Sequence, residues 1–234
     1  ITSTPMAARR LDVYFDVVSP WSYIGVEVIS RYKKVWNLDL RLKPVFLGGI
    51  MQASGNQPPA MLPSKGQYMG QHDLPRSAAF YGMKVQFPSN FPALTVTAMR
   101  VLHVAMDETK DDAEKQYNLV LKLALLLWRG YWGGGCADIG TKEGIAEALL
   151  ADGSLEKSYV ANLLGRTAEP AIKERLKKMT EEAVSLGAFG APWFVLPNPR
   201  TGPAPAVFFG SDRFHLIAHE LGVQWDGGQP RSRF

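Results

Sequence analysis

The segment Ser19-Pro20-Trp21-Ser22 follows directly on residues 11–18, LDVYFDVV. Serine caps the free N–H groups of a helix and proline suits the first helical position, so the segment predicts a helix start. A serine hydroxyl there can donate a hydrogen bond to a thiolate, and the helix N-terminus adds N–H groups and the positive end of its dipole. Such surroundings lower a thiol pKa from ~8.5 to roughly 3.5–7.5. Ser19 could thus activate the thiol of a bound ligand, although a serine in this place is more often only a helix cap.

Other candidates for chemistry are weaker. Cys136 is the only cysteine, so the chain can form no internal disulfide, dithiol centre or all-cysteine metal site. We interpret it as inert rather than nucleophilic, and this cysteine usage fits a reducing compartment. His215 and His219 are one helical turn apart, but the residues between them lack the glutamate of the metalloprotease motif. No metal site is therefore predicted.

The elements that position Ser19 begin with a strand, a helix and a second strand. Residues 11–18 are rich in β-branched and aromatic side chains, which predicts a strand. The helix that opens at Pro20 is expected to run to about Trp36, with Asn37 as its stop. Residues 38–45 alternate apolar and polar side chains, which predicts a second strand with its leucines on one face.

The pattern then changes to helices and returns to strands near the C-terminal end. Residues 49–68 are rich in Gly, Pro, Gln and Ser and predict an ordered loop, whereas helical periodicity dominates residues 94–186. The clearest case is the series Ile172, Leu176, Met179, Ala183 and Leu186. Residues 143–150 and 154–164 predict shorter helices. Residues 193–196 and 206–209 predict a hairpin, and residues 211–221 a final helix that ends before Gly222.

The order of elements predicts an α/β protein with a thioredoxin-like fold and an inserted all-helical domain. Residues 11–50 and 187–225 would form the thioredoxin-like domain together, and residues 51–186 would form the inserted loop and helical domain. Redox proteins with this fold carry Cys-X-X-Cys at the first strand-to-helix turn. Because serines occupy both cysteine positions here, dithiol chemistry through this motif is excluded.

Charge and hydropathy limit the partners. The net charge is +4, but it is accounted for by arginines close to the two ends, Arg9, Arg10, Arg231 and Arg233. No internal basic stripe with interleaved aromatic residues is present, so nucleic-acid binding is not expected. The most apolar stretch, residues 119–132, is too short to span a bilayer and carries two basic residues, so no membrane span is expected.

Four segments resemble the kappa-class glutathione transferases: YFDVVSPWSYIGVEVISRY at residues 14–32, the Gly/Pro-rich stretch at 48–69, GAFGAPWFV at 187–195 and FGSDRFHLIAHELG at 209–222. The resemblance covers nearly the whole chain from residue 11 to residue 225 and is weakest in the middle of the helical block. Together the segments are specific, whereas any one of them alone is only moderately so.

The resemblance implies that Ser19 bonds the sulfur of glutathione, with Pro20 and Trp21 in the same contact segment. Asn56 and Lys65 match positions that hold the backbone or a carboxylate of the tripeptide. Taken alone, Asn56 would be read as a turn residue and Lys65 as a solvated surface charge.

The resemblance also implies contacts near the C-terminal end of the chain. Ala191 stands where the family usually has leucine, directly before a cis-proline, Pro192. Its backbone N–H and C=O would pair with the cysteine of glutathione, and the change from leucine to alanine should spare these backbone contacts. Ser211 and Asp212 match the pair that binds the γ-glutamyl end, although Ser211 could equally cap the last helix.

The resemblance implies a glutathione transferase that conjugates small electrophiles and could also reduce organic peroxides, with glutathione as co-substrate and no other cofactor. One alternative is a glutathione-dependent isomerase similar to the bacterial 2-hydroxychromene-2-carboxylate isomerases, which return glutathione unchanged. The other is a non-catalytic glutathione-binding interaction protein.

The family resemblance implies a homodimer located in mitochondria or peroxisomes, and a cytoplasmic location stays open. The terminal Ser232-Arg233-Phe234 is similar to a peroxisomal targeting tripeptide, although phenylalanine is not the usual last residue.

Overall fold

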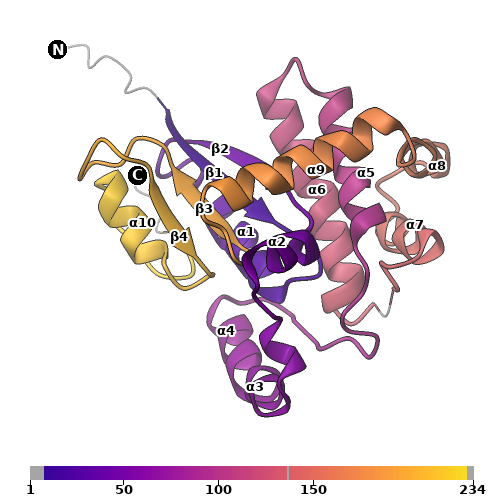
Figure 1. Ribbon diagram of the computed structural model, residues 1–234, viewed down its shortest axis with the longest axis horizontal. Coiled ribbons are helices and arrows are strands. Elements are labelled where there is room, and N and C mark those ends of the chain that lie inside the picture. The colour runs from indigo at the N-terminus through magenta and orange to yellow at the C-terminus, as the bar shows by residue number, and fades with distance from the viewer. Residues whose placement is uncertain (1–7, 136, 231–234) are drawn as a thin grey trace.

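The computed structural model describes residues 8–135 and 137–230, and Cys136 and the terminal tripeptide lie outside them. The described chain contains a four-stranded sheet of order β2-β1-β3-β4 (Figure 1). Its strands are β1 (Arg9–Phe15), β2 (Leu38–Pro44), β3 (Trp193–Leu196) and β4 (Ala206–Phe209). β1 pairs with β2 in parallel and with β3 antiparallel, and β3 pairs with β4 antiparallel. The two ends of the sequence therefore build one sheet, as the thioredoxin-like prediction requires.

The described residues are otherwise largely helical. The α-helices are α1 (Pro20–Tyr32), α2 (Leu47–Ser54), α3 (Pro63–Tyr68), α4 (Leu74–Phe80), α5 (Val96–Glu108), α6 (Ala113–Trp132), α7 (Lys142–Leu150), α8 (Lys157–Arg166), α9 (Pro170–Ser185) and α10 (Phe214–Leu221). A 3-10 turn (Pro59–Met61) and a π-helical turn (Met69–Asp73) connect the short helices between α2 and α4. Helices α3 and α4 project below the rest of the molecule in Figure 1.

The prediction of a loop at residues 49–68 is wrong, because most of this segment is helical. A composition rich in proline and glycine favours a loop, but proline is tolerated in the first turn of a helix, where its missing N–H would have had no partner. Pro63 occupies that position in α3, and Gly55 closes α2 in the left-handed conformation that glycine readily adopts.

Two other helix boundaries differ from the prediction. Helix α1 ends at Tyr32 rather than near Trp36, and Asn37 then adopts a positive φ of 50° before β2 begins. Helix α10 begins at Phe214, so Ser211 lies in the turn before the helix and does not cap it. Boundaries are set by such local turns, which hydrophobic periodicity does not report.

The sheet is covered on both faces. Leu38, Leu40 and Leu42 are buried along one face of β2, which confirms the predicted alternation. Helices α1, α6 and α10 contribute to the hydrophobic cluster on that side, and α9 contributes to a smaller cluster on the other side around Tyr14 and Trp193. Because the sheet is covered on both faces, residues 11–15 of β1 are all buried, including Asp12.

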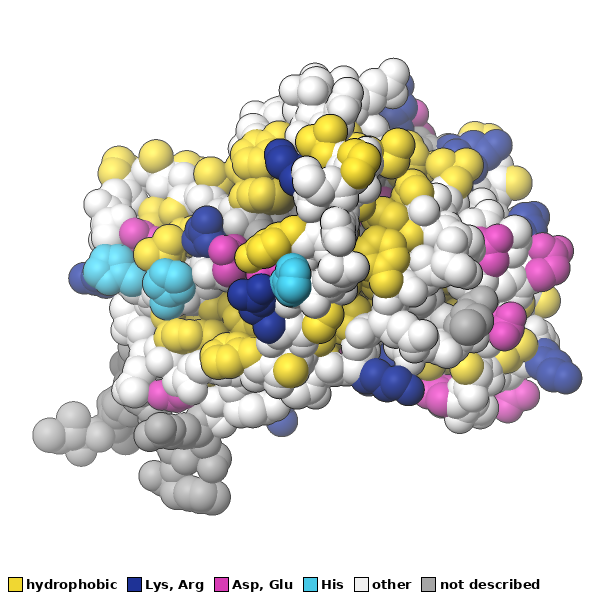
Figure 2. All heavy atoms as spheres, turned by 90° about the horizontal axis from the view of Figure 1, so that it is seen from below, with side chains coloured by type: hydrophobic (Ala, Val, Ile, Leu, Met, Phe, Trp, Pro, Cys, Tyr) yellow, Lys and Arg dark blue, Asp and Glu magenta, His cyan; other side chains and the backbone are white. Residues whose placement is uncertain are grey.

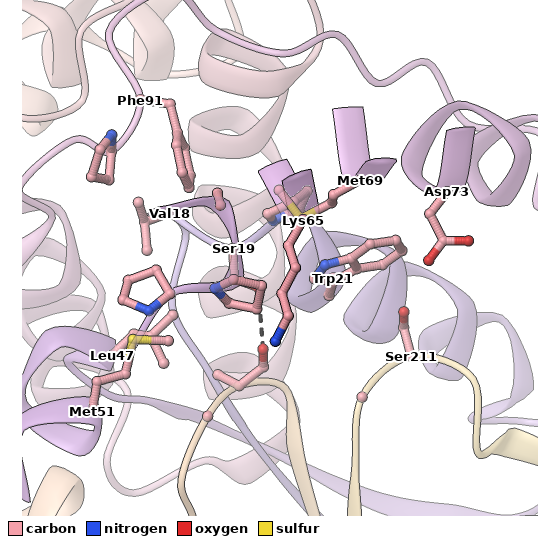
Figure 3. A pocket seen from close by; sticks show the side chains of 18 of the residues that line it. Val18, Ser19, Trp21, Leu47, Met51, Lys65, Met69, Asp73, Phe91 and Ser211 are labelled. Atoms are coloured by element: carbon pink, nitrogen blue, oxygen red, sulfur yellow. Dashed lines mark hydrogen bonds between the residues drawn. The ribbon is translucent and has the colours of Figure 1, made fainter. Parts of the chain in front are cut away.

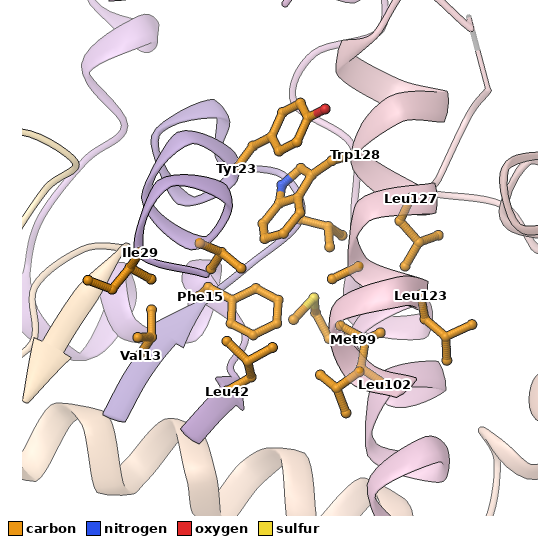
Figure 4. Packing of buried hydrophobic residues seen from close by; sticks show 14 of the residues in the cluster. Val13, Phe15, Tyr23, Ile29, Leu42, Met99, Leu102, Leu123, Leu127 and Trp128 are labelled. Carbon is orange, nitrogen blue, oxygen red and sulfur yellow. The ribbon is translucent and has the colours of Figure 1, made fainter. Parts of the chain in front are cut away.

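Trp128 of α6 joins the sheet to the helical block. Its ring centroid lies 5.3 Å from that of Phe15 on β1 and 5.3 Å from that of Tyr23 on α1, with the Tyr23 ring stacked on it. Figure 4 shows this contact beside aliphatic side chains of β2, α5 and α6, namely Leu42, Met99, Leu102, Leu123 and Leu127. The division of the chain into two domains stays a prediction, and the two parts share this one hydrophobic cluster.

Replacing Trp128 with alanine should lower the free energy of unfolding by about 3–5 kcal/mol, because it removes a fully buried aromatic ring and leaves a cavity. Denaturant unfolding of purified protein measures the change. Val35→Ala is the control, since Val35 is 40% exposed and its truncation should stay within about 0.5 kcal/mol. Equal stability of the two variants would contradict the central position of Trp128.

His103 of α5 should make stability depend on pH. Its ring Nε2 lies 2.9 Å from the carbonyl oxygen of Pro44 and must donate to it, and burial lowers the pKa of this histidine to about 4. Between pH 6.5 and about 4 the unfolded chain binds a proton that the folded chain does not, so stability falls as pH falls through this window. The loss should approach about 3 kcal/mol at about 1.36 kcal/mol per pKa unit.

Urea unfolding of the wild type and of His103→Gln between pH 7 and pH 4 tests this expectation. The glutamine amide can still donate to Pro44 but does not titrate, so the stability difference between the two proteins should shift in favour of the variant as pH falls. A difference that stays constant with pH would show that His103 does not contribute.

Candidate active site

A cavity of about 1320 Å³ lies where the C-terminal end of β1 meets the N-terminus of α1. Its walls come from α2, α3 and α4 and from segments at residues 91–95, 189–191 and 209–212. The residues predicted from the sequence that line it are Ser19, Pro20, Trp21, Asn56, Lys65, Ala191, Ser211 and Asp212. The remaining predicted residue, Pro192, packs against α1, where a Cβ added to Gly25 would lie 2.9 Å from its Cγ. The fold thus gathers these distant segments into one site.

Ser19 caps α1 and also contacts the opposite wall of the cavity. Its Oγ accepts a hydrogen bond from the N–H of Ser22 at 3.1 Å. It also donates to the carbonyl oxygen of Ala191 at 3.2 Å, and Figure 3 draws this bond as a dashed line. A hydroxyl has one proton to donate. To bond a thiolate in the cavity, Ser19 must therefore turn its proton away from Ala191, while its role as a helix cap can persist.

The surroundings of Ser19 suit an anion. Helix α1 begins directly after it with Pro20, and the first turn contains no acidic side chain. The positive end of the helix dipole and the N–H groups of the first turn therefore face a site without a competing carboxylate on this helix.

Asp16 lies under the Ser19 turn and was not predicted from the sequence. It is fully buried, and its carboxylate accepts hydrogen bonds from the N–H of Val18 at 3.0 Å and of Leu47 at 2.8 Å. Burial raises its pKa to about 6, against the opposing effect of these two bonds. An acidic residue directly after the apolar residues 13–15, three positions before Ser19, is a weak signal for it, because it belongs to no spacing pattern.

The segment before Pro192 is held in place from both sides of the cavity. The Ala191–Pro192 peptide bond is cis, as predicted, and the Phe91–Pro92 bond in another wall is also cis. The side-chain amide of Asn56 donates to the carbonyl oxygen of Phe189 at 2.7 Å, so it links the end of α2 to this segment. In the described structure Asn56 thus lines the cavity and also holds the segment before Pro192 against the end of α2.

Charged and polar groups concentrate at one end of the cavity. Lys65 is exposed and forms no ion pair within residues 8–135 and 137–230, whereas Asp73 pairs with Arg76 and Asp212 pairs with Arg213. In Figure 3 the side chains of Lys65, Asp73 and Ser211 extend into the cavity. This end can therefore bind a ligand that carries charges of both signs.

The rest of the cavity is apolar. Its lining there includes Val18, Phe46, Leu47, Met51 and Phe91. Hydrophobic side chains also gather on the molecular face seen in Figure 2. The exposed apolar residues of α3, α4 and nearby segments include Met61, Leu62, Tyr68, Phe80 and Leu94.

Within the described ranges, no cluster of three or more His, Cys, Asp and Glu side chains could hold a metal ion. His215 and His219 are both exposed on α10. No helix in the same ranges is long and apolar enough to cross a membrane.

Comparisons with known proteins place this geometry in a family. A family model described as a DSBA-like thioredoxin domain matches residues 10–222. Glutathione S-transferase kappa 1 of Rattus norvegicus is 34% identical over 229 residues, which cover 96% of each chain. A 2-hydroxychromene-2-carboxylate isomerase of Pseudomonas putida is 24% identical over 216 residues, covering 91% of this chain and 94% of the isomerase.

Solved structures show the same fold. A 2-hydroxychromene-2-carboxylate isomerase superposes with a TM-score of 0.71 at 22% identity, covering 91% of this chain and 94% of that one. At this identity the match supports the fold alone. With 34% identity to a kappa-class enzyme along nearly its full length and a DsbA-like thioredoxin domain, the chain belongs to the kappa-class glutathione S-transferase family.

Proposed function

We propose that the protein binds glutathione in the first cavity, with its sulfur at Ser19, and transfers the thiolate to small electrophiles. The observation that carries the proposal is the buried Ser19 hydroxyl at the N-terminus of α1, which lines a cavity with one charged and one apolar end. The family relationship supports glutathione as the thiol.

The reaction uses a hydrogen bond that changes partner. The thiol of bound glutathione loses its proton to solvent, and the Ser19 hydroxyl turns from the Ala191 carbonyl to the sulfur. The Ala191 carbonyl is then free to accept a hydrogen bond from the backbone N–H of the glutathione cysteine. The thiolate attacks the electrophilic carbon, a C–S bond forms, and the leaving group departs with its electron pair or the adduct takes up a proton from solvent.

The charged end of the cavity suits the ends of the tripeptide. Lys65 can pair with a carboxylate, and Asp212 can pair with the ammonium of the γ-glutamyl group beside Ser211. Asp212 would then exchange its present partner, Arg213, for the ligand. The apolar end would receive the electrophile or an organic peroxide. A homodimer and a mitochondrial or peroxisomal location remain proposals that rest on the family alone.

An isomerase of 2-hydroxychromene-2-carboxylate is the second candidate, favoured by the 24% identity over 91% of the chain. Turnover of a chromene carboxylate with catalytic amounts of glutathione would establish it. A non-catalytic glutathione-binding protein would bind glutathione but show no conjugation above the uncatalysed rate.

Replacing Ser19 with alanine should raise the thiol pKa of bound glutathione by about one to two units and reduce conjugation. A bond to a charged group is worth about 1.5–3 kcal/mol, and one pKa unit corresponds to about 1.36 kcal/mol. The N–H groups of α1 remain, so part of the thiolate stabilisation should survive. Ultraviolet titration of the bound thiolate measures the shift. Loss of the cap should cost about 1 kcal/mol of stability, which is measured separately.

Ser22→Ala is the matched control, because Ser22 belongs to the same motif but its buried Oγ has no hydrogen-bond partner in the described structure. The thiolate of glutathione bound to this variant should titrate like that of glutathione bound to the wild type. If Ser19→Ala also titrates like the wild type, Ser19 is only a helix cap.

Lys65→Ala should weaken glutathione binding by about 1.5–3 kcal/mol, because a charge-assisted bond to a carboxylate is lost. Lys65 has no ion-pair partner in the described part of the chain, so its removal should leave folding stability unchanged. Calorimetric titration gives the affinity, with Lys34→Ala as an exposed lysine outside the cavity for comparison. Equal affinities of these two variants would remove Lys65 from the site.

A further inference from the structure

A second cavity of about 510 Å³ lies on the opposite side of α2, where α2 and α5 pack against α9. The first cavity is bordered by Leu47, Gly48 and Met51 of α2, whereas the second is bordered by Gly49 and Ala53. At 100° per residue these two sets lie on opposite faces of the helix. Figure 1 shows α2 beside the diagonal helix α9.

The interior of the second cavity is mainly apolar. Its lining includes the side chains of Phe46, Ala53, Val96, Leu176 and Val184. A cavity of this kind suits an elongated hydrocarbon group, because burying apolar surface contributes about 25 cal/mol per Å².

The rim of the same cavity carries an excess of positive charge. Arg100, Lys173 and Lys177 line it together with a single acid, Glu181. Lys177 and Glu181 pair at 3.8 Å, which leaves Arg100 and Lys173 without an acidic partner among residues 8–135 and 137–230.

Arg100 adds an independent indication that the second cavity suits an anion. Its Nε is buried and has no hydrogen-bond partner in the described structure. A buried donor without an acceptor is costly, and guanidinium groups pair well with carboxylates. The second cavity thus combines the donors of Arg100 and Lys173, unpaired in the described structure, with an apolar interior.

We propose that this second cavity binds a medium-chain alkyl carboxylate, with its carboxylate at Arg100 and Lys173 and its chain against Phe46, Leu176 and Val184. The uncharged hydrocarbon alone would leave the Arg100 donor unpaired, and a small hydrophilic anion would leave the apolar chamber empty. The two features together select an amphiphile with one negative charge.

The two cavities share a wall. Phe46 lines both of them, and its backbone N–H donates to the hydroxyl of Thr180, which borders the second cavity, at 3.0 Å. A Cβ added to Gly49 would lie 3.3 Å from both the Phe46 ring and the Thr180 methyl group, so the close packing of this wall depends on glycine. The experiment must therefore establish which cavity the ligand occupies.

Calorimetric titration of the intact protein with decanoate, and separately with decanol, tests the proposal. Decanoate should bind more tightly than decanol, and Arg100→Gln should weaken decanoate binding about 10-fold while leaving decanol binding unchanged. Ten-fold corresponds to about 1.4 kcal/mol, close to the low end for a bond to a charged group. Lys178→Gln, an exposed lysine of α9 outside the cavity, should bind decanoate like the wild type.

Two cavity-filling variants locate the ligand. Ala53→Phe places a ring in the second cavity from an exposed position on α2 and should abolish decanoate binding. Ser64→Trp fills part of the first cavity and should leave decanoate binding unchanged. Circular dichroism confirms that each variant is folded. The proposal is overturned if decanoate does not bind, if Arg100→Gln behaves like Lys178→Gln, or if only Ser64→Trp removes binding.

Discussion

The buried carboxylate of Asp16 is the interaction on which the geometry of the first cavity depends. It accepts the N–H groups of Val18 and Leu47, so one side chain joins the turn before α1 to the start of α2. Burial raises its pKa from 3.8 to about 6. The folded protein therefore binds a proton more readily than the unfolded chain, and this group lowers stability as pH rises from 3.8 to 6. At neutral pH the buried carboxylate is ionised, which lowers the folding stability by about 3 kcal/mol. The same carboxylate holds the turn before α1 in place.

The fixed turn gives the Ser19 hydroxyl two possible acceptors. In the described structure it donates to Ala191 across the cavity, and in the proposed reaction it donates to a thiolate. The carbonyl it leaves is the same group that would receive the glutathione backbone. The bond from Ser19 to Ala191 is thus replaced by two bonds, one from Ser19 to the thiolate and one from the glutathione N–H to Ala191. This exchange can couple ligand binding to thiolate stabilisation without movement of α1 or the sheet.

Much of the fold could be predicted from the sequence because its signals are local. Strands β3 and β4 were predicted with their observed bounds, and the leucines of β2 lie on one buried face. The helices between Pro59 and Phe80 could not be predicted, since they are short and start at prolines or continue through a π-helical turn. Asp16 was missed because one acidic residue directly after a strand carries no spacing pattern, and its partner Leu47 belongs to another element.

The sequence by itself determined the order of elements and the serines in place of a redox cysteine pair, because these properties depend on residue type and on spacing along the chain. Of the residues that line the first cavity, residue chemistry pointed to Ser19, whereas the others followed from the resemblance to the kappa class. Only the tertiary structure decided that Ser19 donates to Ala191, that Asn56 braces Phe189 and that Phe46 separates two cavities. Each of these contacts joins residues far apart in the chain, so its direction and distance follow from how the sheet and helices pack.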